Sequence, residues 1–218
     1  MHQTLIQFPE IHLERRDGHK LRGYFANLFG KDSDLFHNHT TEGKSIKRYP
    51  LIQYKVVYGC PSVLGIGKGA TLLTERFLKI NHIDIDGLHI PIHQKNIQSK
   101  EMKVGVETSL FEYEFINPWM ALNEKNYDLF QSYETREEKT ALLERLLTVN
   151  MLHFFGAIPY REEQQILVKT DLHSVPIKFK GQNMMGFKGK FTTNVQLPDF
   201  IGFGKSVSRG FGTIQKIQ

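Results

Sequence analysis

The sequence contains a single cysteine, Cys60, and no apolar run long enough to cross a membrane. One cysteine excludes an intrachain disulfide and a zinc site built on cysteine ligands, and it suits a reducing compartment. A membrane-spanning helix needs about 18 or more predominantly apolar residues. The N-terminal residues also lack the apolar stretch of a signal peptide. These absences predict a cytoplasmic protein that does not associate with a membrane.

Acidic residues are scarce at the C-terminal end of the chain. The 218 residues carry a formal net charge of +5, and the only acid from residue 172 onward is Asp199. The same stretch holds seven basic residues, namely Lys178, Lys180, Lys188, Lys190, Lys205, Arg209 and Lys216. Because positive charge favours an anionic partner such as nucleic acid, this imbalance indicates a binding surface in the C-terminal part.

The first half of the chain predicts one ferredoxin-like domain, residues 1–98. Apolar runs indicate strands at 4–8, 51–58, 62–66 and 88–92, and apolar residues at helical spacing indicate helices at 21–29 and 69–80. The order is strand, helix, strand, strand, helix, strand, which is typical of a ferredoxin-like fold. The polar residues 96–103 suggest a linker to the second half of the chain.

The second half, residues 99–218, suggests a second domain of the same kind. Strands are expected at 104–116, 165–169, 186–195 and 210–217, and a long amphipathic helix at 139–155. The second helix of the repeat would be short or missing. The predicted fold class is therefore α+β, with two tandem ferredoxin-like (RRM-like) domains.

Residues 201–214, IGFGKSVSRGFGTI, hold four glycines, two serines, a lysine and an arginine. Glycine lets a backbone approach a phosphate closely, and successive N–H groups can bind an anion. A P-loop is excluded because Asp199 stands where that motif needs glycine. The segment also resembles an RNA-recognition strand pattern, and its ordinary alternative is a glycine-rich turn. We expect it to lie outside the core, so that Gly204→Val or Gly210→Val would leave the fold intact.

Residues 65–70, GIGKGA, follow a predicted strand and open a predicted helix. That setting is the one a dinucleotide-binding fingerprint requires, and Asp86 lies at a suitable distance downstream. Such a site would make the protein a nucleotide-dependent enzyme. However, no run of strand–helix–strand repeats is present after it, so we favour a simple strand–helix turn.

His37 and His39 lie in a polar loop predicted for residues 31–48. Two histidines at this spacing can bind a metal, but no cysteine and few nearby acids complete a ligand set. They can also transfer protons, since imidazole titrates near neutral pH. Several residues further along could hold a phosphate and stabilise its developing charge, namely Lys44, Lys47, Arg48 and Tyr49. From the residues alone, an ordinary surface loop remains the favoured interpretation.

A family resemblance favours a catalytic site over an ordinary surface loop at His37 and His39. The motif G-x-G-K-S-x-S-R-G-F-G-T-I, residues 202–214, resembles the glycine-rich signature of the Cas6 family, the CRISPR repeat-processing endoribonucleases. Three segments in the first half of the chain also resemble this family, namely L-R-G-Y-F at 21–25, the loop with His37 and His39, and R-Y-P-L-I-Q-Y at 48–54. The resemblance covers essentially the whole chain.

The resemblance implies cleavage of precursor CRISPR RNA within its repeats, without a metal ion or cofactor. Attack by a 2′-hydroxyl would leave a 2′,3′-cyclic phosphate and a 5′-hydroxyl. The implied catalytic residues are His39 first, then His37, Tyr49 and Lys47, all in the N-terminal domain. The implied RNA-binding residues are Gly202, Gly204, Lys205, Ser206, Ser208, Arg209, Gly210 and Gly212.

The implied partner is the CRISPR repeat RNA. A homodimer and association with subunits of a CRISPR effector complex stay open. The main alternative function is that of a non-catalytic RNA-binding protein on the same fold.

Overall fold

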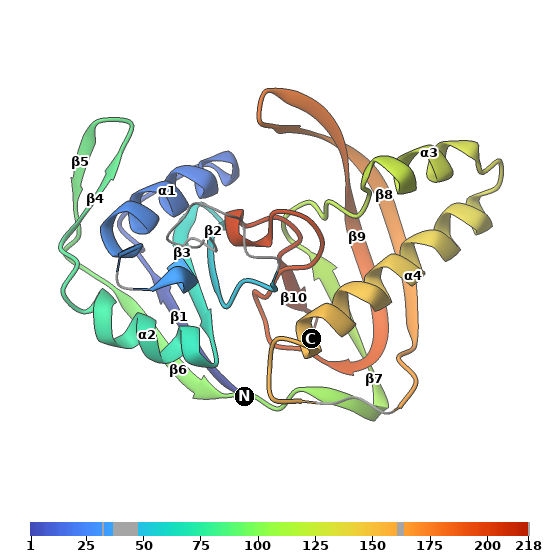
Figure 1. Ribbon diagram of the computed structural model, residues 1–218, viewed down its shortest axis with the longest axis horizontal. Coiled ribbons are helices and arrows are strands. Elements are labelled where there is room, and N and C mark those ends of the chain that lie inside the picture. The colour runs from blue at the N-terminus through green and yellow to red at the C-terminus, as the bar shows by residue number, and fades with distance from the viewer. Residues whose placement is uncertain (32, 37–47, 161–163, 218) are drawn as a thin grey trace. The chain divides into compact units, whose positions relative to one another are not determined.

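The computed structural model describes residues 1–31, 33–36, 48–160 and 164–217, and the chain forms two compact units (Figure 1). Unit 1 consists of Met1–Met102 together with Ser208–Gly210, and unit 2 of Lys103–Val207 together with Phe211–Gln218. Each unit contains a four-stranded antiparallel sheet with helices. The predicted α+β class and its ferredoxin-like domains are confirmed.

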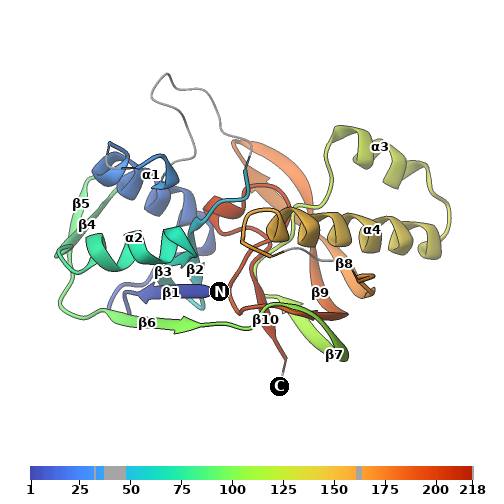
Figure 2. The same cartoon turned by 60° about the horizontal axis from the view of Figure 1, so that its bottom comes forward.

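The main sheet of unit 1 has the strand order β2-β3-β1-β6. The strands and helices of this unit are β1 (His2–Gln7), α1 (Gly18–Phe29), β2 (Ile52–Val57), β3 (Cys60–Ile66), α2 (Lys68–Phe77), β4 (His82–Ile85), β5 (Leu88–Pro91) and β6 (Asn96–Glu101). Two short 3-10 turns, η1 (Arg15–Asp17) and η2 (Asp34–Phe36), flank α1. Figure 2 shows α1 and α2 together on one face of the sheet.

The core of unit 1 follows from the spacing of its apolar residues. Leu21 and Phe25 lie one turn apart on α1, and Leu73 and Phe77 one turn apart on α2, and all four are buried. Alternate residues of β2 point to the same face of the sheet, so Tyr54 packs against these helices. The rings of Phe25 and Phe77 lie 4.7 Å apart between centroids, which joins the two helices directly.

The fourth strand of the first domain is not the one that the sequence pattern indicates. Residues 88–92 were expected to complete the sheet, but β5 pairs with β4 in a separate two-stranded hairpin. The predicted linker at 96–103 instead contains β6, which pairs antiparallel with β1 along its whole length. All six side chains of β6 are exposed, so its polar sequence resembles a linker. The pairing is made by the backbone, which a side-chain pattern does not report.

Unit 2 has the strand order β10-β7-β9-β8. Its helices and strands are β7 (Gly105–Phe115), α3 (Glu124–Ser132), α4 (Arg136–Phe155), β8 (Val168–Phe179), β9 (Gln182–Gln196) and β10 (Ile214–Lys216). A 3-10 turn, η3 (Val207–Arg209), precedes β10, and its last two residues belong to unit 1. Between β9 and β10, within the described residues, that turn is the only helical element. The expectation of a short or missing second helix is therefore confirmed.

Two features of unit 2 were missed from the sequence. The helix α3 was not predicted, although Asn123 caps it by accepting a hydrogen bond from Asn126 N. The strands β8 and β9 are much longer than expected and form a hairpin that turns at Lys180 and Gly181, which have φ values of 51° and 79°. Among the described residues, no helix is long and apolar enough to cross a membrane.

Candidate nucleic-acid interface

Three of the four proposed catalytic residues, His37, His39 and Lys47, lie outside the described residues. The fourth, Tyr49, is partly buried just before β2 and is held by a defined contact. Its hydroxyl accepts a hydrogen bond of 3.0 Å from Gln53 Nε2, which also donates to Pro50 O at 3.2 Å. A residue of the unit 1 sheet, Gln53 on β2, therefore orients the phenol of Tyr49.

The contact to Tyr49 continues into the interior through a buried lysine. Lys55 Nζ donates to Gln53 Oε1 over 2.9 Å, and the Lys55 side chain is fully buried. Burial lowers the pKa of the Lys55 ammonium well below its ordinary value, since removal from water disfavours the charged form. The resulting chain of polar groups, Lys55 to Gln53 to Tyr49, fixes one amide orientation and with it the position of the phenol.

Two arginines from distant parts of the sequence come together within unit 1. The carbonyl oxygen of Arg209, in the glycine-rich segment, lies close to Gly18, the first residue of α1. A Cβ on Gly18 would lie only 2.6 Å from that oxygen, so only glycine fits at this position. The pKa of Arg22 on α1 is lowered, mainly because its guanidinium is partly buried and to a lesser extent because of the positive charge of Arg209. Two guanidinium groups that repel each other are suited to bind one shared anion such as a phosphate. Arg22 is not predictable as a site residue from the sequence, because no spacing rule connects it with residue 209.

The glycine-rich segment, residues 201–214, is part of the core, and the expectation that it lies outside the core is wrong. Ile201, Phe203 and Val207 are buried. A Cβ on Gly204 would lie 2.6 Å from both Met120 O and Trp119 Nε1. The glycines therefore let the segment pack against its own unit, and substitution by valine would disturb the fold itself. The predicted binding residues that retain exposed surface are Gly204, Lys205, Ser206, Ser208 and Arg209.

Among the glycines of the glycine-rich segment in unit 2, Gly212 should lose the most stability on substitution. Its φ is +63°, and an added Cβ would meet Phe203 O at 2.0 Å. We expect Gly212→Ala to lower the free energy of unfolding by about 3 kcal/mol, as the sum of backbone strain and steric overlap. Gly181→Ala is the matched control, because Gly181 has a φ of +79° but nothing within 4 Å of its added Cβ. Urea denaturation of both variants measures the difference, and equal losses would refute the packing role of Gly212.

Lys205 also lines an open pocket of unit 2 with a volume of about 590 Å³. The other lining residues combine apolar, aromatic and amide side chains with one hydroxyl and one carboxylate, and they are Leu122, Asn123, Glu124, Tyr127, Ser174, Val175, Pro176, Gln182, Asn183, Met184 and Met185. An aromatic ring beside apolar walls can stack on a nucleobase, amides can contact the base edge, and an ammonium can contact the phosphate. The pocket is thus chemically suited to a nucleotide of a single-stranded RNA.

The dinucleotide-binding alternative at residues 65–70 fails on topology. A dinucleotide fingerprint needs parallel strands around the glycine turn, whereas β3 pairs antiparallel with both β1 and β2. A Cβ on Gly69 would lie 2.3 Å from Leu51 O, and one on Gly65 would lie 2.6 Å from Gly69 O. These glycines therefore allow α2 to pack closely on the sheet, as the preferred interpretation of a strand–helix turn requires.

Family models match both halves of the chain. The model for the Cas6b N-terminal domain matches residues 1–103, and the model for the Cas6b C-terminal domain matches residues 105–217. A crystal structure of a Cas6b protein is 36% identical, covers 99% of each chain and has a TM-score of 0.93. A second, of the CRISPR RNA processing endoribonuclease Cas6b, is 33% identical over 100% of both chains with a TM-score of 0.80.

A curated relative extends the similarity to an archaeal sequence. An uncharacterized protein of Methanocaldococcus jannaschii is 30% identical over 145 residues, which cover 66% of this chain and 98% of the relative.

Proposed function

Because this chain belongs to the Cas6b family of CRISPR RNA processing endoribonucleases, we propose that it cuts precursor CRISPR RNA within its repeats without a metal ion. A ribose 2′-hydroxyl attacks the neighbouring phosphate, and the products carry a 2′,3′-cyclic phosphate and a 5′-hydroxyl. The observation that carries the family assignment is the pair of model matches, which together span nearly the whole chain. The proposed substrate of this protein is an intracellular transcript, so we also propose a cytoplasmic location.

The proposed chemistry needs proton transfer, charge stabilisation and a positioned phosphate. His39, with His37 as second choice, transfers the proton, since imidazole is effective near neutral pH. Tyr49 and Lys47 stabilise the charge that develops on the phosphate. The hydrogen bond from Gln53 to the Tyr49 hydroxyl supports this role, because a phenol held in place needs no reorganisation during the reaction.

The RNA backbone is proposed to contact the exposed part of the glycine-rich segment. Lys205, Ser206, Ser208 and Arg209 offer charge and hydroxyl groups to phosphates. The glycines of the segment, Gly202, Gly204, Gly210 and Gly212, act by shaping its backbone. Arg22 joins Arg209 in holding one phosphate, which would relieve the repulsion between the two guanidinium groups.

Removal of two of these charges should change how binding depends on salt. Neutralising each phosphate of a single strand contributes about 0.7 to the slope of log affinity against log salt. We expect Lys205→Ala/Arg209→Ala to weaken RNA binding and to flatten that slope by about 1.4. The control is Lys79→Ala/Lys100→Ala, which removes two exposed charges of unit 1. Filter binding over a series of salt concentrations measures both, and an unchanged slope in the first variant argues against this surface.

The direct test of the proposed function is incubation of the protein with its own repeat RNA in EDTA. We expect one cut per repeat. The downstream fragment should accept a phosphate from polynucleotide kinase, which requires a 5′-hydroxyl, and the upstream 3′ end should resist phosphatase until acid opens the cyclic ester. RNA that is bound but stays intact would establish the non-catalytic alternative. Cleavage that disappears in EDTA would overturn the metal-independent mechanism.

A further inference from the structure

The β4–β5 hairpin of unit 1 presents a polar face that the proposed cleavage does not use. Its two strands are joined by Asp86 and Gly87, whose φ values of 54° and 80° suit a tight two-residue turn. Ile83 and Ile85 are buried against the core of unit 1. Because side chains alternate along a strand, the intervening residues of β4 point away from that core.

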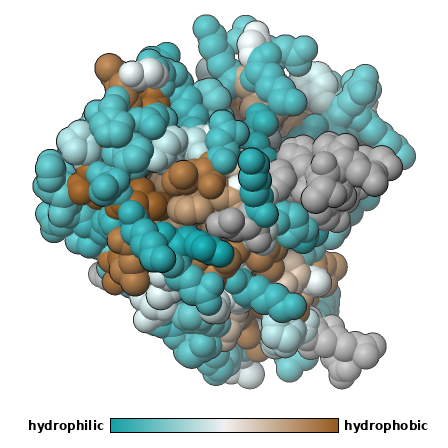
Figure 3. Space-filling view, turned by 60° about the vertical axis from the view of Figure 1, so that its left-hand side comes forward, coloured by the Kyte–Doolittle hydropathy of each residue, from teal (hydrophilic) through white to brown (hydrophobic). Residues whose placement is uncertain are grey.

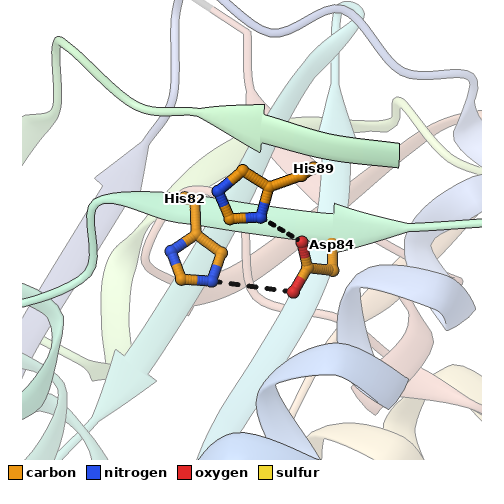
Figure 4. A group of neighbouring side chains, drawn as sticks. All are labelled: His82, Asp84 and His89. Carbon is orange, nitrogen blue, oxygen red and sulfur yellow. Dashed lines mark hydrogen bonds and ion pairs between the residues drawn. The ribbon is translucent and has the colours of Figure 1, made fainter. Parts of the chain in front are cut away.

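Three metal-binding side chains come together on this outer face. His82 and Asp84 lie two residues apart on β4, and Asp84 stands directly opposite His89 in the register of the hairpin. Figure 4 shows the three side chains converging. One ligand atom of each lies within 4.8 Å of the others, and the two imidazole rings are 4.2 Å apart between centroids.

The distances around the carboxylate are close to those between ligands of one metal ion. Asp84 Oδ1 lies 2.8 Å from His89 Nδ1, and Asp84 Oδ2 lies 3.6 Å from His82 Nε2. Two ligand atoms that are each about 2.0–2.1 Å from a tetrahedral zinc ion lie about 3.3 Å apart. The observed values lie on either side of this separation, so small side-chain rotations would complete the geometry.

The surroundings of His82 orient it as a ligand. Its Nδ1 lies 2.8 Å from Asn81 Oδ1, and the tautomer with the proton on Nδ1 donates a hydrogen bond to that oxygen. In that tautomer the lone pair of Nε2 faces Asp84 Oδ2, 3.6 Å away, so that both atoms can bind one cation. A hydrogen bond from the second ring nitrogen to an oxygen is the usual support of a metal-binding histidine.

We propose that His82, Asp84 and His89 bind one Zn²⁺ ion, with water in the remaining position. Two imidazole nitrogens and a carboxylate suit zinc better than Mg²⁺ or Ca²⁺, which prefer oxygen ligands. Coordination through Nδ1 requires the neutral His89 ring with its proton on Nε2, so the hydrogen bond between Nδ1 and Asp84 gives way to the metal bond without net loss of a proton from the neutral ring. The ion links β4 to β5 and stabilises the hairpin.

Solvent reaches the proposed site. The side chains of His82, Asp84 and His89 are 36%, 49% and 67% exposed. From the side of the molecule that carries the hairpin in Figure 1, hydrophilic side chains cover most of the surface, with a smaller hydrophobic group among them (Figure 3). Metal ions can therefore enter without opening the fold, and substitution of these residues should leave the core intact.

The test is a zinc titration of the metal-stripped, full-length protein in competition with a chromogenic chelator. We expect one equivalent bound by the unsubstituted protein. His89→Ala and Asp84→Asn should each weaken binding on the order of 100-fold, since the loss of even outer-shell partners costs about 10–100-fold. Histidine NMR signals give a second measurement, because only the His82 and His89 rings should shift with the first equivalent.

Two control variants keep the assignment specific. His153→Ala removes an exposed histidine of unit 2, and His37→Ala/His39→Ala removes two histidines that are two positions apart in the sequence. Both should bind zinc like the unsubstituted protein. The proposal is overturned if the unsubstituted protein binds no zinc, if His89→Ala and Asp84→Asn bind it normally, or if only the His37/His39 variant loses it. None of these outcomes depends on RNA cleavage.

Discussion

A precursor RNA with a single 2′-deoxy ribose just upstream of the scissile phosphate should remain uncut by this protein. In the proposed mechanism the 2′-hydroxyl is the nucleophile, so its removal leaves no group to attack the phosphate. Intramolecular attack needs mainly positioning and proton transfer, which explains why side chains can replace a metal. Binding should stay near normal, because one hydroxyl contributes little beside several phosphate contacts.

The measurement compares the modified and unmodified RNA in the same EDTA buffer, with affinity determined separately by filter binding. A 2′-deoxy ribose placed several nucleotides away serves as the control and should leave cleavage unchanged. If the RNA modified at the cut site is still cleaved, water or another nucleophile attacks the phosphate. The proposed mechanism would then be wrong, although the family assignment would stand.

His39→Ala should produce the second large effect, a loss of about 10²–10⁴-fold in the cleavage rate at saturating protein. That range is the usual contribution of a general acid or base. RNA affinity should change little, since a neutral imidazole contributes less to phosphate binding than lysine or arginine does. The rate of the unsubstituted protein should also change between about pH 6 and 7, where imidazole titrates.

Single-turnover kinetics of three variants separate the roles within this site. His37→Ala tests the second candidate, and Tyr49→Phe should cost less than His39→Ala because water can partly replace the hydroxyl. His153→Ala, an exposed histidine of unit 2, should cleave normally. Full activity in both His37→Ala and His39→Ala would place the active site elsewhere.

The two helices of unit 1 were predictable because each buries one face. The helices around Leu21 and Phe25 and around Leu73 and Phe77 repeat their apolar residues at helical spacing, because one face of each packs on the sheet. The strand β6 has no buried face and was taken for a linker. The length of the β8–β9 hairpin was underestimated for a related reason, since much of β8 is exposed and lacks a clear apolar pattern.

The candidate site was only partly predictable. The motifs around His39, Tyr49 and Arg209 indicated the family, which the family models confirm. The contact from Gln53 to Tyr49 could not be anticipated, and neither could the approach of Arg22 to Arg209, which lie 187 positions apart in the numbering. The glycines of the C-terminal segment were interpreted as space for phosphate, whereas Gly204 and Gly212 leave space for the protein's own backbone and the Trp119 ring.

The sequence by itself thus determined the fold class, the family and the type of chemistry, since these follow from local periodicity and from short motifs. Only the tertiary structure decided which strand completes the first sheet, which glycines the packing requires and which distant side chains meet. His82, Asp84 and His89 illustrate the difference. Strand alternation places the first two on one face, but only the hairpin register sets His89 opposite Asp84. Register depends on a turn and on backbone pairing, and so on contacts that no single stretch of sequence contains.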